Sequence, residues 1–157
     1  MKKPHSMDIE PHQILNQAEL FLIAAQRLRT EEPTNKGTFV LQSGVCAALS
    51  IELFFKYLIF LSTKSLADIK THKLDVLFNK ITPPHRQAIM ENITSIIPED
   101  QFNYILKKSS NAFISLRYIY ECDEIYNPTW LHKIADLLNN ECQRISKKSN
   151  EETGDST

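Results

Sequence analysis

The sequence predicts an all-α protein, folded as a bundle of about five or six helices. Apolar residues recur at spacings of three and four along most of the chain, as they do in amphipathic helices. No segment of useful length alternates apolar and polar residues as a half-buried strand would. Prolines and short polar segments interrupt the apolar stretches, so we expect short connections between separate helices.

The N-terminal part of the chain is predicted to form two long helices. The first runs from a cap at Asp8 to about Thr30, with an apolar stripe made of Ile14, Leu15, Ala18, Leu22, Ala25 and Leu28. The second follows a connection at 31–36, covers about 39–63 and is apolar almost all round, which is typical of a buried central helix. Glu52 and Lys56 interrupt it, so we expect no membrane span.

Shorter helices are expected in the rest of the chain, after a turn or short helix that begins at Ser65. The first of them is predicted to start at a cap, Thr71, and to end before the prolines at 83 and 84. The next three are predicted at 85–96, at 99–120 with a bend at 109–111, and from Trp130 to about Ser146. The segments 1–8 and 147–157 lack an apolar block. One helical domain at 9–146 between two disordered ends is therefore predicted.

The composition excludes several classes of protein. The chain has three glycines in 157 residues, and Gly37 and Gly44 fit no dinucleotide or phosphate loop, which excludes Rossmann enzymes and P-loop NTPases. A formal net charge of −1 provides no overall attraction to nucleic acid or acidic lipid. Three widely spaced cysteines, and no secretory signal in residues 1–7, favour free thiols in the cytoplasm. No cofactor is expected.

Two polar groups on predicted helices stand out as candidate functional residues. Glu52 and Lys56 lie four residues apart in the apolar helix, so they form either a half-exposed surface pair or a polar seam inside a bundle or dimer contact. Arg117 lies among aromatic residues, with Tyr118 beside it and Glu121 one turn further along. Its guanidinium could bind a carboxylate or phosphate, or tie helices together through Glu52 or Glu121.

Two histidines could take part in chemistry. His72 follows Thr71 at a predicted helix start, where a neutral imidazole could act as an acid, a base or a hydrogen-bond donor, or could simply be a capping or core-edge residue. His132 and Asp136 share a helix face, but two ligands without a third are a weak metal signal. We therefore assign no metal site.

Three segments in this order resemble the HEPN family: AALSIELFFKYLI at 47–59, THKLDVLF at 71–78 and FISLRYIYE at 113–121. They match an alanine-rich helix with Glu and Lys four apart, a helix start with His, Leu and Leu, and a helix with an aromatic residue, Arg and Tyr. The resemblance implies a compact up-and-down helical bundle, commonly a homodimer, that binds nucleotides or RNA. It also implies a place in toxin-antitoxin or phage-defence systems, with a nucleotidyltransferase or antitoxin as partner.

Many HEPN proteins are metal-independent ribonucleases with an Arg followed by His after four to six residues, and this chain lacks that signature after each of its arginines. We therefore expect a binding module for a nucleotide, RNA or a partner protein. In this hypothesis Glu52, Lys56, His72 and Arg117, with Tyr118 and Glu121 nearby, form a polar cluster that lines a groove or dimer cleft. The alternatives are a metal-independent endoribonuclease that uses Arg117 and His72, and a non-catalytic scaffold subunit.

Overall fold

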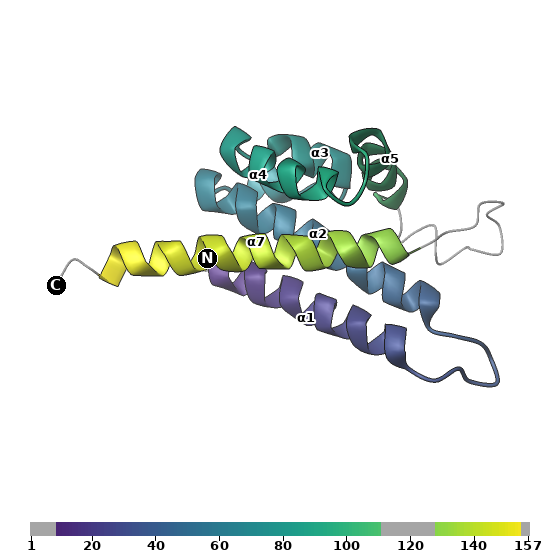
Figure 1. Ribbon diagram of the computed structural model, residues 1–157. Coiled ribbons are helices and arrows are strands. Elements are labelled where there is room, and N and C mark those ends of the chain that lie inside the picture. The colour runs from purple at the N-terminus through teal and green to yellow at the C-terminus, as the bar shows by residue number, and fades with distance from the viewer. Residues whose placement is uncertain (1–8, 111–127, 155–157) are drawn as a thin grey trace, which may run out of the picture.

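The computed structural model describes residues 9–110 and 128–154 and confirms the all-α fold. These residues contain six α-helices and no strand, apart from an isolated bridge between Thr34 and Gly37. Figure 1 labels the elements, which are α1 Pro11–Thr30, α2 Val40–Thr63, η1 Leu66–Ile69, α3 Leu74–Lys80, α4 Pro83–Thr94, α5 Glu99–Ser109 and α7 Thr129–Gly154.

α1 and α2 form an antiparallel hairpin held by small residues. Ala18 and Ala25 of α1 and Ala47 of α2 are fully buried, so the two backbones can approach closely. Ser50 Oγ donates to the Ala18 carbonyl oxygen at 2.9 Å, and Ser43 Oγ donates to the Ala25 carbonyl oxygen at 2.9 Å. These bonds satisfy two hydroxyl groups that would otherwise be buried without partners.

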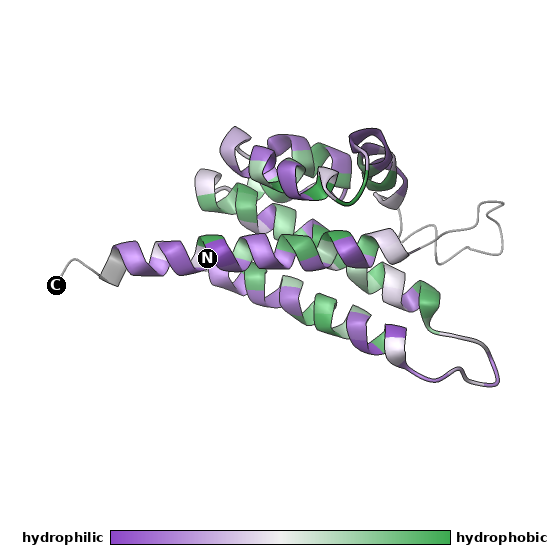
Figure 2. Cartoon of the chain, viewed as in Figure 1, coloured by the Kyte–Doolittle hydropathy of each residue, from purple (hydrophilic) through white to green (hydrophobic). Residues whose placement is uncertain are grey.

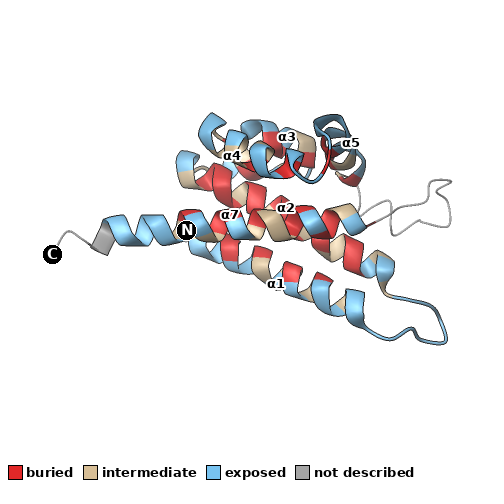
Figure 3. Ribbon diagram, in the orientation of Figure 1, coloured by how far each residue is buried: buried red, intermediate tan, exposed pale blue. Residues whose placement is uncertain are grey.

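α2 is the central helix, as the sequence predicts. α7 lies along the α1–α2 hairpin, and α3, α4 and α5 gather on another side of α2 (Figure 1). α2 carries more buried positions than any other helix in Figure 3, and its fully buried large residues are Ile51, Phe54, Phe55, Leu58 and Ile59. In the described part of the chain, α2 is also the single helix long and apolar enough to cross a membrane, but 72% of its apolar window is buried in the molecule.

Aromatic packing fixes α3 and α5 against α2. The rings of Phe55 and Phe78 have centroids 5.6 Å apart, and Phe78 and Phe102 pack edge to face at 5.2 Å. All three rings are buried, and such pairs add stability beyond the burial of their surface. This chain of contacts fixes the position of the segment that leads into α3, which contains His72.

Several predicted helix boundaries differ from the structure. Lys73 is the N-cap of α3, and the expected cap, Thr71, accepts a hydrogen bond from the Lys73 backbone N–H at 3.2 Å. The prolines at 83 and 84 begin α4, because a helix start does not use the N–H that proline lacks. The expected cap of the first helix, Asp8, and the predicted helix beyond Ser110 lie outside the described residues.

The last helix continues eight residues into the range 147–157 that the sequence predicts to be disordered. Residues 147–152 are all exposed, and Figure 2 shows that this end of α7 is mainly hydrophilic. Ile145 is the last residue of α7 that contributes to the core. The core therefore ends at Ile145, and residues 147–152 of α7 extend beyond it.

Candidate functional site

The candidate site begins with an acid on the central helix. Glu52 is 9% exposed, and it lies between the fully buried residues Ile51 and Phe54. A buried carboxylate needs a charged or hydrogen-bonding partner, because losing its hydration costs several kcal/mol. α2 supplies one partner itself: Lys56 Nζ lies 2.7 Å from Glu52 Oε1, one turn further along the helix. Both side chains are 12% exposed, so the pair belongs to a polar seam and is not a half-exposed surface pair.

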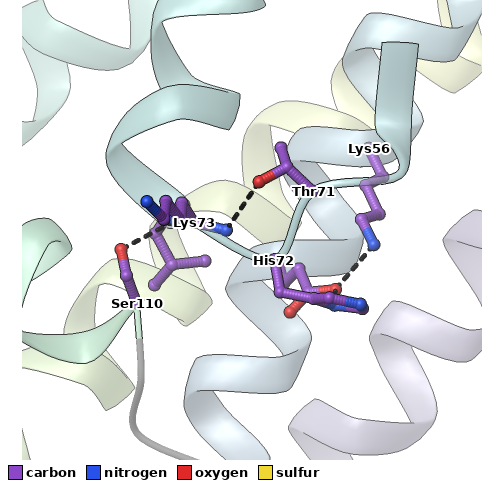
Figure 4. Close-up of polar contacts among 7 residues, drawn as sticks. Lys56, Thr71, His72, Lys73 and Ser110 are labelled. Carbon is purple, nitrogen blue, oxygen red and sulfur yellow. Dashed lines mark hydrogen bonds and ion pairs between the residues drawn. The ribbon is translucent and has the colours of Figure 1, made fainter. Parts of the chain in front are cut away.

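The second partner comes from the segment between η1 and α3. Ile69 and Leu74 are buried on either side of this segment and anchor it to the core. The Leu74 backbone N–H donates to Ser110 Oγ at 2.8 Å, which ties the start of α3 to the end of α5. The intervening residues are thus held in place, and His72 is directed toward α2 (Figure 4).

The two elements meet at one oxygen atom. His72 Nδ1 lies 2.8 Å from Glu52 Oε1, the same oxygen that binds Lys56 Nζ. An ionised carboxylate only accepts hydrogen bonds, so Nδ1 carries the proton and donates it to Glu52. In the neutral ring the lone pair is therefore on Nε2. The His72 side chain is 77% exposed, whereas the side chains of Glu52 and Lys56 are largely buried.

This arrangement gives His72 more chemistry than an ordinary surface histidine. A carboxylate on Nδ1 fixes the tautomer and the orientation of the ring. Nε2 can then accept a proton, act as a nucleophile or, in the protonated ring, donate to an anion. Lys56 balances the charge of Glu52 in the same cluster.

The structure brings together three of the four residues that the sequence analysis groups in one cluster, namely Glu52, Lys56 and His72. Arg117, Tyr118 and Glu121 lie outside the described residues, so their place in this cluster stays a prediction. His72 is neither a helix cap nor a core-edge residue. It is an exposed ring bound to a buried acid.

A second polar pair, which the sequence analysis does not find, lies between α2 and α7. His132 Nε2 is 2.7 Å from Ser43 Oγ, and the two residues are 2% and 1% exposed. The single hydroxyl proton of Ser43 is donated to the carbonyl oxygen of Ala25, so Nε2–H of His132 donates to Ser43 Oγ. Nδ1 of His132 is then a buried acceptor with no partner among the described residues.

The surroundings of His132 keep its ring neutral. Burial lowers the pKa of His132, the nearby charge of Arg29 lowers it further, and Asp136 acts in the opposite direction. The signal in the sequence is weak but present: His132 directly follows Leu131 and lies one turn before Ala135, and both of these apolar residues are buried.

The other polar contacts of α7 are structural. Arg144 binds the buried carboxylate of Glu141 through two nitrogen atoms at 3.0 and 2.5 Å, and this bond lowers the pKa of Glu141 although burial opposes it. Asp136 accepts a hydrogen bond from Gln26 of α1 at 2.9 Å. Within 9–110 and 128–154, no three His, Cys, Asp or Glu residues are placed to hold a metal ion.

The two thiols in the described part of the chain do not form a reactive site. Cys142 is fully buried, and burial, together with the charges of Glu141 and Glu19, raises its pKa well above the usual range. Burial also raises the pKa of Cys46. Both are free cysteines, and neither thiol has the depressed pKa of a nucleophilic cysteine.

No family model matches this chain, and no curated protein or solved structure is significantly similar to it.

Proposed function

We propose that this protein is a HEPN-like helical module that binds a nucleotide or RNA without metal, at the cluster of Glu52, Lys56 and His72. The observation that supports this function is the meeting of Lys56 and His72 at one buried oxygen of Glu52. Two of the three segments that resemble HEPN proteins, 47–59 and 71–78, supply these residues. A buried acid paired with a largely buried lysine costs free energy in a core, and its presence therefore favours a functional role.

The surroundings of His72 suit an anionic ligand. Lys70 and Lys73 lie two residues before and one residue after His72, and both are exposed. The nearby carboxylate of Asp75 already has a hydrogen-bond donor, since it accepts from Ser110 Oγ at 3.2 Å. The attraction is local, because the whole chain has a net charge of −1. Such a surface favours contact with a few phosphate groups over a long polyanion.

Fluorescence anisotropy with a labelled single-stranded RNA, with ATP as competitor, tests this function. His72→Ala and Lys73→Ala should each weaken RNA binding by about fivefold to tenfold, the range for one charged contact. Lys36→Ala is the matched control for Lys73→Ala: it removes an exposed lysine from the connection between α1 and α2 and should leave RNA binding unchanged. Binding that is absent, or equally weakened by all three variants, contradicts the proposal.

The second candidate is a metal-independent endoribonuclease. The outward lone pair of His72 Nε2 favours it, because RNA cleavage needs a base for the 2′-hydroxyl. Arg117 would stabilise the charge on phosphorus in this mechanism. Incubation of total RNA with the wild type, Arg117→Ala and His72→Ala in the presence of a chelator tests it. No cleavage, or the same cleavage by all three proteins, rejects it.

The resemblance to HEPN proteins extends the proposal to assembly and biology. It includes a homodimer, a nucleotidyltransferase or antitoxin as partner, a toxin-antitoxin or phage-defence system, and a cytoplasmic location. Sedimentation velocity tests the dimer, and a monomer at all accessible concentrations contradicts it. If neither RNA nor nucleotide binds and a partner protein does, the chain is a scaffold subunit instead.

A further inference from the structure

The histidines of the described residues have four different environments. His12 is exposed, His85 is half-buried and His132 is buried against Ser43. His72 combines two features, since it is highly exposed and its Nδ1 is hydrogen-bonded to a carboxylate. These are the two requirements for an imidazole that attacks an electrophile brought to it from solution: an accessible lone pair on Nε2, and a fixed tautomer.

We propose that His72 is a phosphoryl-accepting nucleophile, which takes a phosphoryl group on Nε2 from an activated donor such as an acyl phosphate or a phosphoramidate. The proposal uses the same cluster as the proposed function, but it does not depend on RNA or nucleotide binding. Nothing in it requires Arg117 or any other residue outside the described part of the chain.

The exposure of the ring favours group transfer over acid–base catalysis. A general base acts on a substrate held beside it, in a concave site that excludes water. The His72 side chain is 77% exposed, so the described residues cover less than a quarter of it. A ring this open can meet a reactive phosphorus atom on another molecule, and it can later pass the group on.

The geometry around Glu52 supports the chemical step. The lone pair of Nε2 forms the nitrogen–phosphorus bond while the bond from phosphorus to the donor's leaving group breaks. The leaving group departs with that electron pair, as a carboxylate from an acyl phosphate or as ammonia, after protonation by water, from a phosphoramidate. The positive charge that the ring gains is stabilised through Nδ1–H by Glu52 Oε1, 2.8 Å away.

Lys56 has a matching role. Its Nζ lies 2.7 Å from the oxygen that holds His72, so Lys56 fixes the Glu52 carboxylate in place as the acceptor for Nδ1–H. Glu52 and Lys56 both act through His72 and are therefore positioning residues.

The test is phosphorylation of the intact chain with potassium phosphoramidate and, separately, acetyl phosphate. Peptide mapping at neutral pH and ³¹P NMR identify the acid-labile nitrogen–phosphorus bond and its position. His12 is the internal control, because it is exposed on the same molecule and no carboxylate of residues 9–110 or 128–154 is hydrogen-bonded to it. His72 should react about tenfold faster than His12, the effect expected of a carboxylate that orients a histidine.

Variants separate positioning from mere exposure. Glu52→Gln keeps an oxygen that accepts from Nδ1 but loses the charge, so the rate at His72 should fall toward that at His12 in the same sample. If Glu52→Gln does not fold, the ratio of the phosphorylation rates at His72 and His12 in the wild type still tests the proposal. Equal rates at His72 and His12 overturn the proposal, as does a rate at His72 that Glu52→Gln leaves unchanged. RNA binding without preferential phosphorylation would leave only the proposed function standing, and the reverse result would leave only this inference.

Discussion

Two histidines touch the central helix, and the difference between them separates reactive from structural chemistry in this molecule. His72 donates from Nδ1 to the charged acid Glu52 and leaves most of its ring in solvent. His132 donates from Nε2 to the neutral hydroxyl of Ser43 and is 2% exposed. Both bonds are short, so distance does not distinguish the two sites.

The charge of the partner and the access of water distinguish them. At His132, burial and Arg29 lower the pKa, and the free nitrogen points into protein, so the ring stays neutral and fixes α7 to α2. At His72 the buried partner is an ion, and the free nitrogen belongs to an exposed ring. A histidine that contacts a central helix is therefore a candidate for chemistry when its partner is a buried ion and its own ring is open.

The largest expected effect comes from removal of Glu52. Glu52→Ala leaves Lys56 largely buried without its partner, and we expect a loss of about 3 to 5 kcal/mol in the free energy of unfolding, measured by urea denaturation. The double variant Glu52→Leu with Lys56→Leu removes both charges and should be close to wild type, since apolar replacements of a buried ion pair are often neutral. A loss below about 1 kcal/mol for Glu52→Ala would mean that Lys56 reaches water.

Removal of Ser43 is the matching change at the other histidine. Ser43→Ala leaves the Nε2–H of His132 buried without an acceptor, which should cost about 1 to 3 kcal/mol. The matched control is Ser50→Ala, which loses only a bond to the Ala18 carbonyl oxygen and should cost about 1 kcal/mol or less. Equal losses in urea denaturation would show that the hydrogen bond of His132 contributes nothing specific.

The pH dependence of stability should distinguish the two sites further. The pKa of His132 is lowered in the folded state from 6.5, so below that pH the unfolded chain takes up the proton more readily. The contribution of His132 to the free energy of unfolding should be fully present above about pH 6.5. It should be lost as the pH drops from there toward the lower folded-state pKa. His132→Gln, which can still donate to Ser43, should flatten this fall in urea denaturation between about pH 7.5 and 5.5.

Glu141 provides a check on that interpretation. The pKa of Glu141 is lowered from 4.5 in the folded state, so its contribution to the free energy of unfolding is fully present above about pH 4.5. That contribution is lost only as the pH falls through the folded-state pKa, which is lower still. A fall in stability that begins near pH 6.5 therefore cannot come from Glu141. If His132→Gln keeps the same fall as the wild type, another group is responsible and the account of His132 is wrong.

The smallest expected effect is that of His72→Ala on stability. The ring is mostly exposed, and Lys56 still satisfies Glu52, so the loss in the free energy of unfolding should be at most about 1 kcal/mol. Urea denaturation of His72→Ala and Ser43→Ala under the same conditions compares their losses in the free energy of unfolding. A larger loss than for Ser43→Ala would mean that His72 serves the fold, and it would remove the contrast between the two histidines.

The sequence by itself determined the helices and their buried faces. The spacing of Ile14, Leu15, Ala18, Leu22 and Ala25 places these residues in the core, as predicted, because helical periodicity is a local property. Leu28, the last residue of the predicted stripe, is only half-buried because it lies near the end of α1. The apolar run at 39–63 is also a local property, and it identified the central helix. The pair of Glu52 and Lys56 could also be read directly, since residues four apart in a helix are neighbours.

The cluster of Glu52, Lys56 and His72 was a hypothesis from the sequence, but only the tertiary structure decided the contacts between residues far apart in the chain. His72 reaches Glu52 across 20 residues of chain, and His132 reaches Ser43 across 89. No local pattern encodes such distances, because they depend on how α3 and α7 pack against α2. The same packing, by leaving one ring in water and enclosing the other, decided which histidine is available for chemistry.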